Sequence, residues 1–245
     1  MGIHQKLIDC ATPWVGGQKI KEMRFGLGYS CVELTDGRMG VAWTPDQKTC
    51  TCTHLEAAGQ IAGQPAETIL GWLNCDNPLE RTAALAVFNA LNSRRERLFT
   101  EGEATSLLKI QSSDHVVMIG FFAPVVPTIK ATGCRFEVVE LDPDKPGISP
   151  EQGFRALEEC DIAIITATSI INGTFDGLAS ALKRNRAALI LGPSTPMCPE
   201  AFAGTRITQL SGSYVKDHDR VKLIVSEGGG TRLLKKHLRF ANTLV

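Results

Sequence analysis

The pattern of hydrophobic and polar positions changes near residue 105. Beyond that point, short continuous apolar runs alternate with stretches of helical spacing. The apolar runs cover residues 116–120, 136–140, 162–166, 188–192 and 208–212. Continuous apolar strands separated by helices indicate a parallel sheet that is covered on both faces. We therefore predict an α/β fold, with a doubly wound, Rossmann-like domain over residues 105–245.

Before residue 105 the pattern predicts a small α+β domain over residues 1–104. Residues 3–15 have the spacing of an amphipathic helix. Two apolar segments, 29–34 and 38–43, flank an Asp36-Gly37 step that suits a hairpin turn. A later helix is indicated by Asn77, which can cap it, and by a proline in its first turn. At the other end of the chain, three consecutive glycines at 228–230 predict a hinge before a basic helix over 232–239.

Small and polar residues follow each predicted strand of the second domain. In doubly wound sheets, ligands bind just beyond the carboxyl ends of the strands. Glycine allows close backbone approach, and hydroxyl or amide side chains both donate and accept hydrogen bonds. We therefore expect a polar small molecule to bind at this rim. The candidate ligand-binding residues are Gly120, Glu140, Thr166, Thr168, Asn172, Gly192, Pro193, Ser194, Thr195 and Gly212.

Glu140 and Gly120 have the spacing at which a Rossmann domain places a carboxylate to hold ribose hydroxyls. The glycine fingerprint is missing, however, because Phe121 and Phe122 follow Gly120. This absence argues against a dinucleotide cofactor. The alternative interpretation of Glu140 is a carboxylate at a strand end in water.

Two turns after predicted strands each have a structural and a functional interpretation. The turn at 192–196 can be a rigid connection in which Ser194 or Thr195 caps a helix beginning near Cys198, or it can present a helix N-terminus to an anion. Asn172 can cap the next helix, or its amide can face the ligand. Asn89 belongs with these residues, because a buried amide on an alanine-rich helix must bond across a domain interface or face a polar cavity. We favour the cavity.

Cys50, Cys52 and His54 alternate in a TCTCTH segment. In an extended chain, the three side chains would share one face and could bind a metal, with Cys31 or Cys75 as a fourth ligand. The alternative is a half-exposed strand or loop without metal. Cys134, Cys160 and Cys198 are expected to be packing thiols, although a helix start near Cys198 would favour a lowered thiol pKa.

Composition limits the classes of function. The chain has 26 basic and 26 acidic residues among its 245 and is 43% hydrophobic, which is typical of a globular protein and argues against a nucleic-acid binder. No apolar run has the roughly 20 residues needed to span a bilayer, and the N-terminus lacks the apolar core of a signal peptide. We expect a cytoplasmic protein with no membrane span and with reduced cysteines.

The second half resembles a family of bacterial and archaeal proteins known as "putative heavy-metal chelation" proteins. The resemblance covers about residues 110–218, and weaker markers lie in the first half at 40–42 and 89–90. The pattern consists of Asp114-His-Val-Val-Met-Ile-Gly120, Pro124, Glu140, 161–166, Thr168, 172–174, 192–194, Pro196, Pro199 and 210–212. It implies a first domain like the small N-terminal domain of enolase, a Rossmann-like second domain and a ligand cavity between them. It also implies metal-chelate or siderophore-type ligands.

Three functions remain open at this point. The chain binds a polar small molecule, such as a metal chelate, between its domains; or it is an enzyme, a transferase or lyase, acting on such a metabolite there; or it carries metal through Cys50, Cys52 and His54. None of the histidines lies in a recognised catalytic motif. We favour the first function, and we further expect a homodimer and a functional link to metal-chelate transport.

Overall fold

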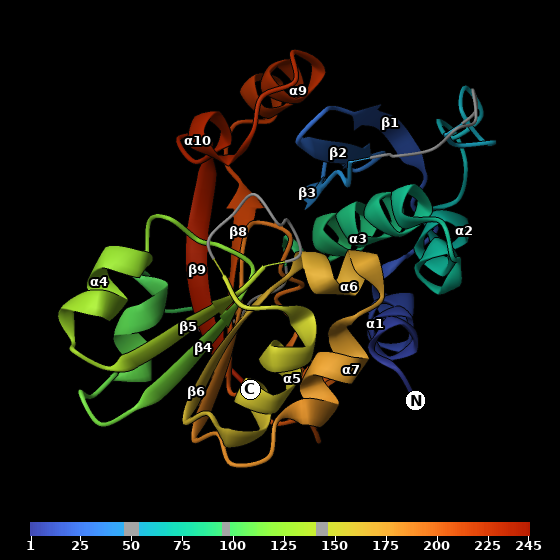
Figure 1. Cartoon of the computed structure of the whole chain (residues 1–245). Coiled ribbons are helices and arrows are strands. Elements are labelled where there is room, and N and C mark those ends of the chain that lie inside the picture. Colours follow the sequence, from blue (N-terminus) through green and yellow to red (C-terminus); the bar gives the residue numbers. More distant parts are fainter. Residues whose placement is uncertain (47–53, 95–98, 141–146) are drawn as a thin grey trace.

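Two β-sheets and one long helix between them organise the chain (Figure 1). The computed structural model describes residues 1–46, 54–94, 99–140 and 147–245. The smaller sheet is antiparallel and has the order β1-β2-β3. Its strands are β1 (Ile20–Phe25), β2 (Tyr29–Leu34) and β3 (Met39–Trp43). The predicted hairpin is confirmed, because β2 and β3 pair around Gly37, whose φ is +81°. The strand β1 was not predicted.

The helices of the first half surround one face of this sheet. They are α1 (Ile3–Ala11), η1 (Thr12–Trp14), α2 (Ala66–Leu70), η2 (Gly71–Asn74) and α3 (Pro78–Asn92). The helix predicted over 3–15 is shorter than expected: α-helical geometry ends at Ala11 and a 3-10 turn follows. Pro13 accounts for this end, since proline has no N–H to donate within a helix and its ring clashes with the preceding turn.

The second half forms the larger sheet. Its elements are η3 (Ala104–Leu108), β4 (His115–Ile119), α4 (Val126–Ala131), β5 (Arg135–Val139), α5 (Pro150–Glu159), β6 (Ile162–Thr166), α6 (Thr168–Asn172), α7 (Phe175–Ala181), β7 (Ala187–Leu191), α8 (Pro199–Phe202), β8 (Gln209–Val215), α9 (His218–Ser226), α10 (Thr231–Leu234) and β9 (Leu238–Leu244). The strand order is β5-β4-β6-β7-β8-β9. All neighbouring pairs are parallel except β8 and β9. The predicted α/β fold with a parallel, Rossmann-like sheet is confirmed.

The prediction of a basic C-terminal helix over residues 232–239 is wrong. The short helix α10 ends at Leu234, and the chain continues as β9, which pairs antiparallel with β8 from Gln209↔Leu244 to Val215↔Leu238. The reason is tertiary. The outer edge of β8 offers unpaired backbone groups, and hydrogen bonds to that edge outweigh the local helical preference of a lysine- and arginine-rich segment.

Alternate residues of the large sheet face different layers. Val116, Met118 and Ile164 point into the cluster that contains Ile129 of α4 and Leu108 of η3. Their neighbours in sequence point into the main core, which includes residues of α5, α7 and α8. That main core continues into α1, α2 and α3 of the first half without interruption. The two halves of the chain therefore share one core.

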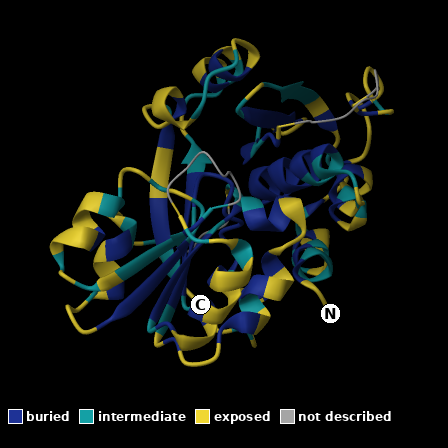
Figure 2. Ribbon diagram, in the orientation of Figure 1, coloured by how far each residue is buried: buried dark blue, intermediate teal, exposed yellow. Residues whose placement is uncertain are grey.

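The helix α3 lies at the centre of this shared core. Every residue from Thr82 to Asn92 is buried, and Figure 2 shows the helix as a nearly continuous buried ribbon. A helix that is buried on every side needs neighbours on every side. The small sheet supplies one side and α1, α2 and α6 supply others. The opposite face of the small sheet is covered by α9 and α10, which return from the C-terminal part of the chain.

Candidate functional site

The strand order places a topological switch point between β4 and β6. The connection after β4 leads to β5 on one side, whereas the connection after β6 leads to β7 on the other side. Loops therefore diverge at the carboxyl ends of β4 and β6, which is where ligands bind in doubly wound sheets. Gly120 directly follows β4, Thr166 is the last residue of β6, and Glu140 directly follows β5, which pairs with β4.

Gly120 allows the loop after β4 to approach β6 closely. Its φ is +82°, and a Cβ atom at this position would lie 3.2 Å from both Cβ and Cγ2 of Thr166. Its N–H donates to the carbonyl oxygen of Val139 (2.9 Å), so the turn is tied to β5 as well. A side chain here would be strained by the backbone angle and crowded by Thr166.

Two threonine hydroxyls lie at the same edge. Oγ1 of Thr166 and Oγ1 of Thr168 are 3.0 Å apart, and the backbone N–H of Thr168 also donates to Oγ1 of Thr166 (3.3 Å). Both side chains are half-buried. Since a hydroxyl has one donor and two acceptor positions, this pair retains capacity for a polar ligand.

Glu140 lies across the β4 loop from these hydroxyls. Its Oε2 accepts a hydrogen bond from the backbone N–H of Phe121 (3.3 Å). The carboxylate thus fixes Phe121, the first residue after Gly120. No pattern in the sequence indicates this hydrogen bond to the Phe121 amide. Gly120, Glu140, Thr166 and Thr168 form the group that we call the switch-point rim. It is half-buried throughout.

The turn after β7 has a different role. Oγ1 of Thr195 donates to the carbonyl oxygens of Gly192 (2.8 Å) and Ser211 (2.9 Å), and Oγ of Ser213 donates to that of Pro193 (3.2 Å). The alternative in which Ser194 or Thr195 caps the following helix does not hold, because α8 begins at Pro199 and has no side-chain cap. The turn is rigid through its own hydrogen bonds and its burial.

Ser194 connects the two halves of the chain. It is only 2% exposed, and its Oγ accepts from the backbone N–H of Trp43 at the end of β3 (2.8 Å). Gly212 makes room for this joint, since a Cβ atom there would lie 2.8 Å from Sδ of Met197 and 2.9 Å from the carbonyl oxygen of Thr195. These residues hold the turn between β8 and the small sheet.

Asn89 takes part in the same joint. Its Nδ2 donates to the carbonyl oxygens of Val41 (3.0 Å) and Ser194 (3.2 Å), so its amide bonds across the interface of the two halves. The prediction that this amide faces a polar cavity is therefore wrong, and the alternative of a bond across the interface holds. Asn92 lies one helical turn further along α3 and donates from Nδ2 to the carbonyl oxygen of Met197 (2.8 Å). Asn92 was not among the residues predicted from the sequence, although its spacing from Asn89 was a usable signal.

Asn172 lies apart from both groups. It is the last residue of α6 and is exposed. The next helix, α7, has Thr174 at its N-cap position and no side-chain cap, so Asn172 does not cap it. The tertiary structure therefore divides the predicted set in three: the switch-point rim, the interdomain joint of Asn89, 192–195 and Gly212, and an exposed amide at the end of α6.

Of the predicted thiol and imidazole ligands, Cys50 and Cys52 lie outside the described residues. His54 is exposed, and its carbonyl oxygen accepts from Nδ2 of Asn77 (3.2 Å). Cys31 faces the cluster under α9, where burial raises its pKa to about 12. Burial and a hydrogen bond with Glu80 also raise the pKa of Cys75. Within the described ranges, no group of three or more His, Cys, Asp or Glu side chains is placed to hold a metal ion.

Cys160 and Cys198 are buried thiols. Burial raises the pKa of Cys160 to about 11. The pKa of Cys198 is raised to about 12. Burial is the larger cause, and the hydrogen bond between its Sγ and Oε2 of Glu200 (3.2 Å) is the second. A neutral thiol is a poor nucleophile and a poor metal ligand. The packing role expected for both residues agrees with this burial.

Comparisons with known proteins identify the family of both halves. A family model described as "Putative heavy-metal chelation" (DUF364) matches residues 103–244, and a second model with the same description (DUF4213) matches residues 8–92. An uncharacterised protein of Methanocaldococcus jannaschii is 26% identical over 227 residues, which cover 89% of this chain and 86% of that protein.

Two solved structures share the fold. A DUF364-family protein of unknown function from Pyrococcus horikoshii has a TM-score of 0.87 and 24% identity, with 100% of both chains covered. Another, from Desulfitobacterium hafniense, has a TM-score of 0.80 and 21% identity, with 98% of this chain and 99% of that chain covered. In the part of the chain that the structure describes, no helix combines the length and apolarity needed to cross a membrane.

Proposed function

Because the chain belongs to the DUF364 family, whose model description is "Putative heavy-metal chelation", we propose that it binds a polar small molecule of the metal-chelate or siderophore type at the switch-point rim. The single observation that carries this proposal is the meeting of Gly120, Thr166 and Thr168 at the carboxyl ends of β4 and β6. It combines close backbone approach with paired hydroxyls at the place where doubly wound sheets bind ligands.

The chemistry of the rim suits a chelate. Thr166 and Thr168 offer hydrogen bonds to the oxygen atoms with which hydroxamate, catecholate or carboxylate chelators hold a metal. Glu140 adds a carboxylate that can accept from ligand hydroxyl or amide groups, while it also orders the Phe121 amide. A chelated metal brings its own donor atoms, so this mode of binding needs no cluster of protein ligands.

Native mass spectrometry of untreated protein tests the proposal directly. We expect a mass excess that contains both an organic ligand and a metal. Added ferric trihydroxamate should shift the mass by one equivalent. If preparations contain the polypeptide alone and the ferric trihydroxamate does not bind, the proposed function is wrong.

Matched substitutions locate the ligand. Thr168→Val removes one hydroxyl at nearly constant shape and should weaken binding about tenfold, because one or two hydrogen bonds are lost. Glu140→Gln keeps the shape but removes the charge. Thr128→Val on α4 and Glu158→Gln on α5 are the controls, since both residues are exposed and lie outside the rim. Metal that is retained in the rim variants but lost in Cys50→Ser and Cys52→Ser would instead support the thiol carrier.

A further inference from the structure

Two exposed leucines lie together at the end of the molecule formed by α9, α10 and the hairpin of β1 and β2 (Figure 1). Leu27, in the turn of that hairpin, is 83% exposed, and Leu233 of α10 is 54% exposed. Both lie against the turn between α9 and α10. A Cβ atom at Gly228 would lie 3.1 Å from Cδ1 of Leu27, and one at Gly229 would lie 3.4 Å from Cδ1 of Leu233. The two side chains therefore flank one turn and face water.

The backbone that carries Leu27 is closely packed. A Cβ atom at Gly26 would overlap the carbonyl oxygen of Val225, so the hairpin approaches the end of α9 as closely as two backbones can. Oγ1 of Thr231 donates to the hydroxyl group of Tyr29 (3.1 Å) and ties the start of α10 to β2. The exposed position of Leu27 is therefore fixed by the fold.

Basic residues gather around this turn. Residues 216–239 include seven lysine or arginine residues but only three acidic ones, whereas the whole chain has 26 of each kind. Arg232, Lys235 and Lys236 are exposed on α10 and directly after it. Lys216 is also exposed and lies nearby, because its backbone N–H donates to the carbonyl oxygen of His237 (3.0 Å). We call this group the basic cap; its members are Leu27, Lys216, Arg232, Leu233, Lys235 and Lys236.

The four cations of the basic cap are not neutralised by carboxylates. Among the described residues, none of the four has an acidic side chain within ion-pair distance. Two other cations of the same region are paired, Lys222 with Glu33 and Arg239 with Glu101. The charge of the basic cap therefore faces water and is available to an external anion.

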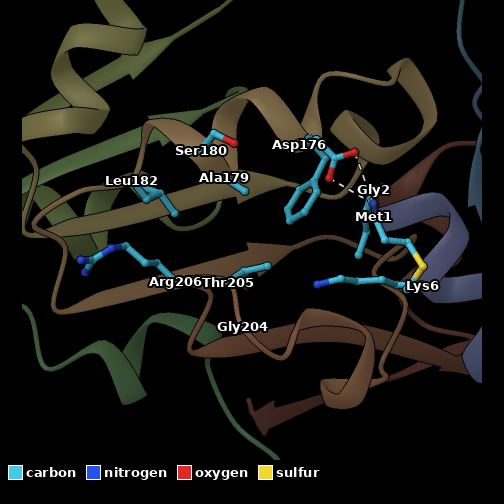
Figure 3. A pocket seen from close by; sticks show the side chains of 12 residues that line it. Met1, Gly2, Lys6, Asp176, Ala179, Ser180, Leu182, Gly204, Thr205 and Arg206 are labelled. Atoms are coloured by element: carbon cyan, nitrogen blue, oxygen red, sulfur yellow. Dashed lines mark hydrogen bonds between the residues drawn. The ribbon is translucent and has the colours of Figure 1, made fainter.

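A lysine elsewhere in the chain shows the contrast. Lys6 and Arg206 line a hollow between α1, α7 and the segment before β8 (Figure 3). Nζ of Lys6 is used within the fold, since it donates to the carbonyl oxygen of Ala203 (3.1 Å). Within the described ranges, the three lysines of the basic cap make no such hydrogen bond from Nζ, so the fold does not need their charge.

An anionic lipid surface fits both features of the basic cap. Its headgroups attract the cations, and the hydrocarbon below them accepts apolar side chains. The phosphate backbone of a nucleic acid would engage the cations but leave the leucines in water. A stable protein interface covers about 800 Å² on each partner and has an apolar centre, for which two separate leucines are too small. Membrane association instead gains from each cation and each inserted side chain.

We propose that the basic cap is a docking surface for a membrane that contains anionic lipids. The cations lie among the headgroups, and Leu27 and Leu233 enter the boundary between headgroups and acyl chains. Such peripheral binding needs no membrane-spanning helix, and it is independent of the ligand proposed for the switch-point rim. Each lysine or arginine at the surface increases the affinity about fivefold, which corresponds to about 1 kcal/mol.

Cosedimentation with lipid vesicles tests this proposal on the full chain. Vesicles made of equal parts of phosphatidylserine and phosphatidylcholine should bind the protein, whereas vesicles of phosphatidylcholine alone should bind it at least about tenfold more weakly. Binding should also fall at least about tenfold between about 0.1 and about 1 M salt, because salt screens the exposed charges.

Substitutions in the basic cap should separate the roles of charge and apolar contact. Lys235→Gln combined with Lys236→Gln should weaken vesicle binding about 25-fold. Leu27→Gln should weaken it about tenfold without a change in charge. Glu227→Lys, at an exposed acidic residue before the glycine turn, should strengthen it. All these side chains are exposed, so the fold should be retained.

Matched controls lie at the other end of the molecule. Lys183→Gln combined with Arg184→Gln removes the same charge from the exposed loop between α7 and β7. Leu244→Gln replaces a leucine that is 67% exposed at the far end of β9, opposite Gln209 of β8. Both controls should bind vesicles like the wild type.

Three results would overturn the proposal. The first is equal binding to vesicles with and without phosphatidylserine, or no binding to either. The second is a loss of binding in the controls as large as that in the variants of the basic cap. The third is binding of duplex DNA as tight as that of the anionic vesicles, with no effect of Leu27→Gln on either, which would indicate a general polyanion surface.

Discussion

At the scale of single residues, one glycine explains why the small sheet and α3 can pack so closely. A Cβ atom at Gly40 of β3 would lie 2.2 Å from the carbonyl oxygen of Ala86 and 2.4 Å from the backbone nitrogen of Ala90. Both contacts are to backbone atoms in the buried part of α3, and backbone atoms cannot rotate away as a side chain could. The marker residues at 40–42 and 89–90 therefore meet at one helix–sheet contact.

We predict that Gly40→Ala destabilises the protein by at least the ~1–3 kcal/mol typical of an overpacked core. Chemical denaturation monitored by circular dichroism measures the free energy of unfolding. Gly71→Ala is the control, since Gly71 has helical backbone angles and nothing within 4 Å of its Cβ position. An equal effect of the two substitutions would contradict the packing argument.

At the scale of elements, α3 depends on a defined start. Oδ1 of Asn77 accepts from the backbone N–H of Leu79 (2.9 Å), and Pro78 occupies the first turn, as the sequence predicted. The same side chain donates from Nδ2 to the carbonyl oxygen of His54. The cap therefore fixes the helix start and also ties the preceding segment to it.

Asn77→Ala should lower the free energy of unfolding by about 1 kcal/mol, because it removes the N-cap acceptor. Asn77→Ser restores an acceptor and should recover most of that loss, although it does not replace the donor to His54. Thermal and denaturant unfolding of the three proteins measure the effect. If serine were no better than alanine, the contact with His54, and not the cap, would be the important interaction.

At the scale of the whole molecule, an ion-pair network joins α9 to the small sheet. Glu33 of β2 accepts from Nζ of Lys21 (2.7 Å) and from Nζ of Lys222 on α9 (3.0 Å). These hydrogen bonds hold the pKa of Glu33 below its usual value, and the bond from Lys21 has the largest effect. Burial of the carboxyl acts in the opposite direction. The side chain is 8% exposed, so solvent screens the pair with Lys222 only weakly.

This network predicts a defined dependence of stability on pH. A carboxyl whose pKa is lowered by folding contributes stability that is fully present above its unfolded pKa, near 4.5, and is lost as the pH falls through the folded pKa. The difference in free energy of unfolding between wild type and Glu33→Gln should therefore be on the order of 1–3 kcal/mol at pH 7. It should shrink steadily below about pH 4.5.

Denaturation at a series of pH values measures this difference. Glu67→Gln on α2 is the control, because Glu67 is exposed and has no ion pair among the described residues. It should change stability little at any pH. A Glu33→Gln effect that is constant from pH 7 to pH 3 would contradict an electrostatic role.

The sequence by itself determined the elements whose signals are local. Apolar runs located the parallel strands to within one or two residues, apart from the longer carboxyl end of β8, and Asp36-Gly37 and Asn77 located a hairpin and a helix start. These features could be predicted because periodicity, turn geometry and capping each depend on residues close together in the chain. The residues of the switch-point rim could be proposed from the sequence for the same reason, since each ends or closely follows a predicted strand.

Only the tertiary structure decided how those elements combine. Residues 238–244 form a strand because they pair with the edge of β8. Asn89 and Ser194, which belong to different halves of the chain, are joined by a hydrogen bond. The tertiary structure also brought Lys6 and Arg206 to one hollow although they are far apart in sequence. Such outcomes depend on which backbone and side-chain groups, far apart in sequence, are buried against one another and hydrogen-bonded. Local sequence patterns do not contain this information.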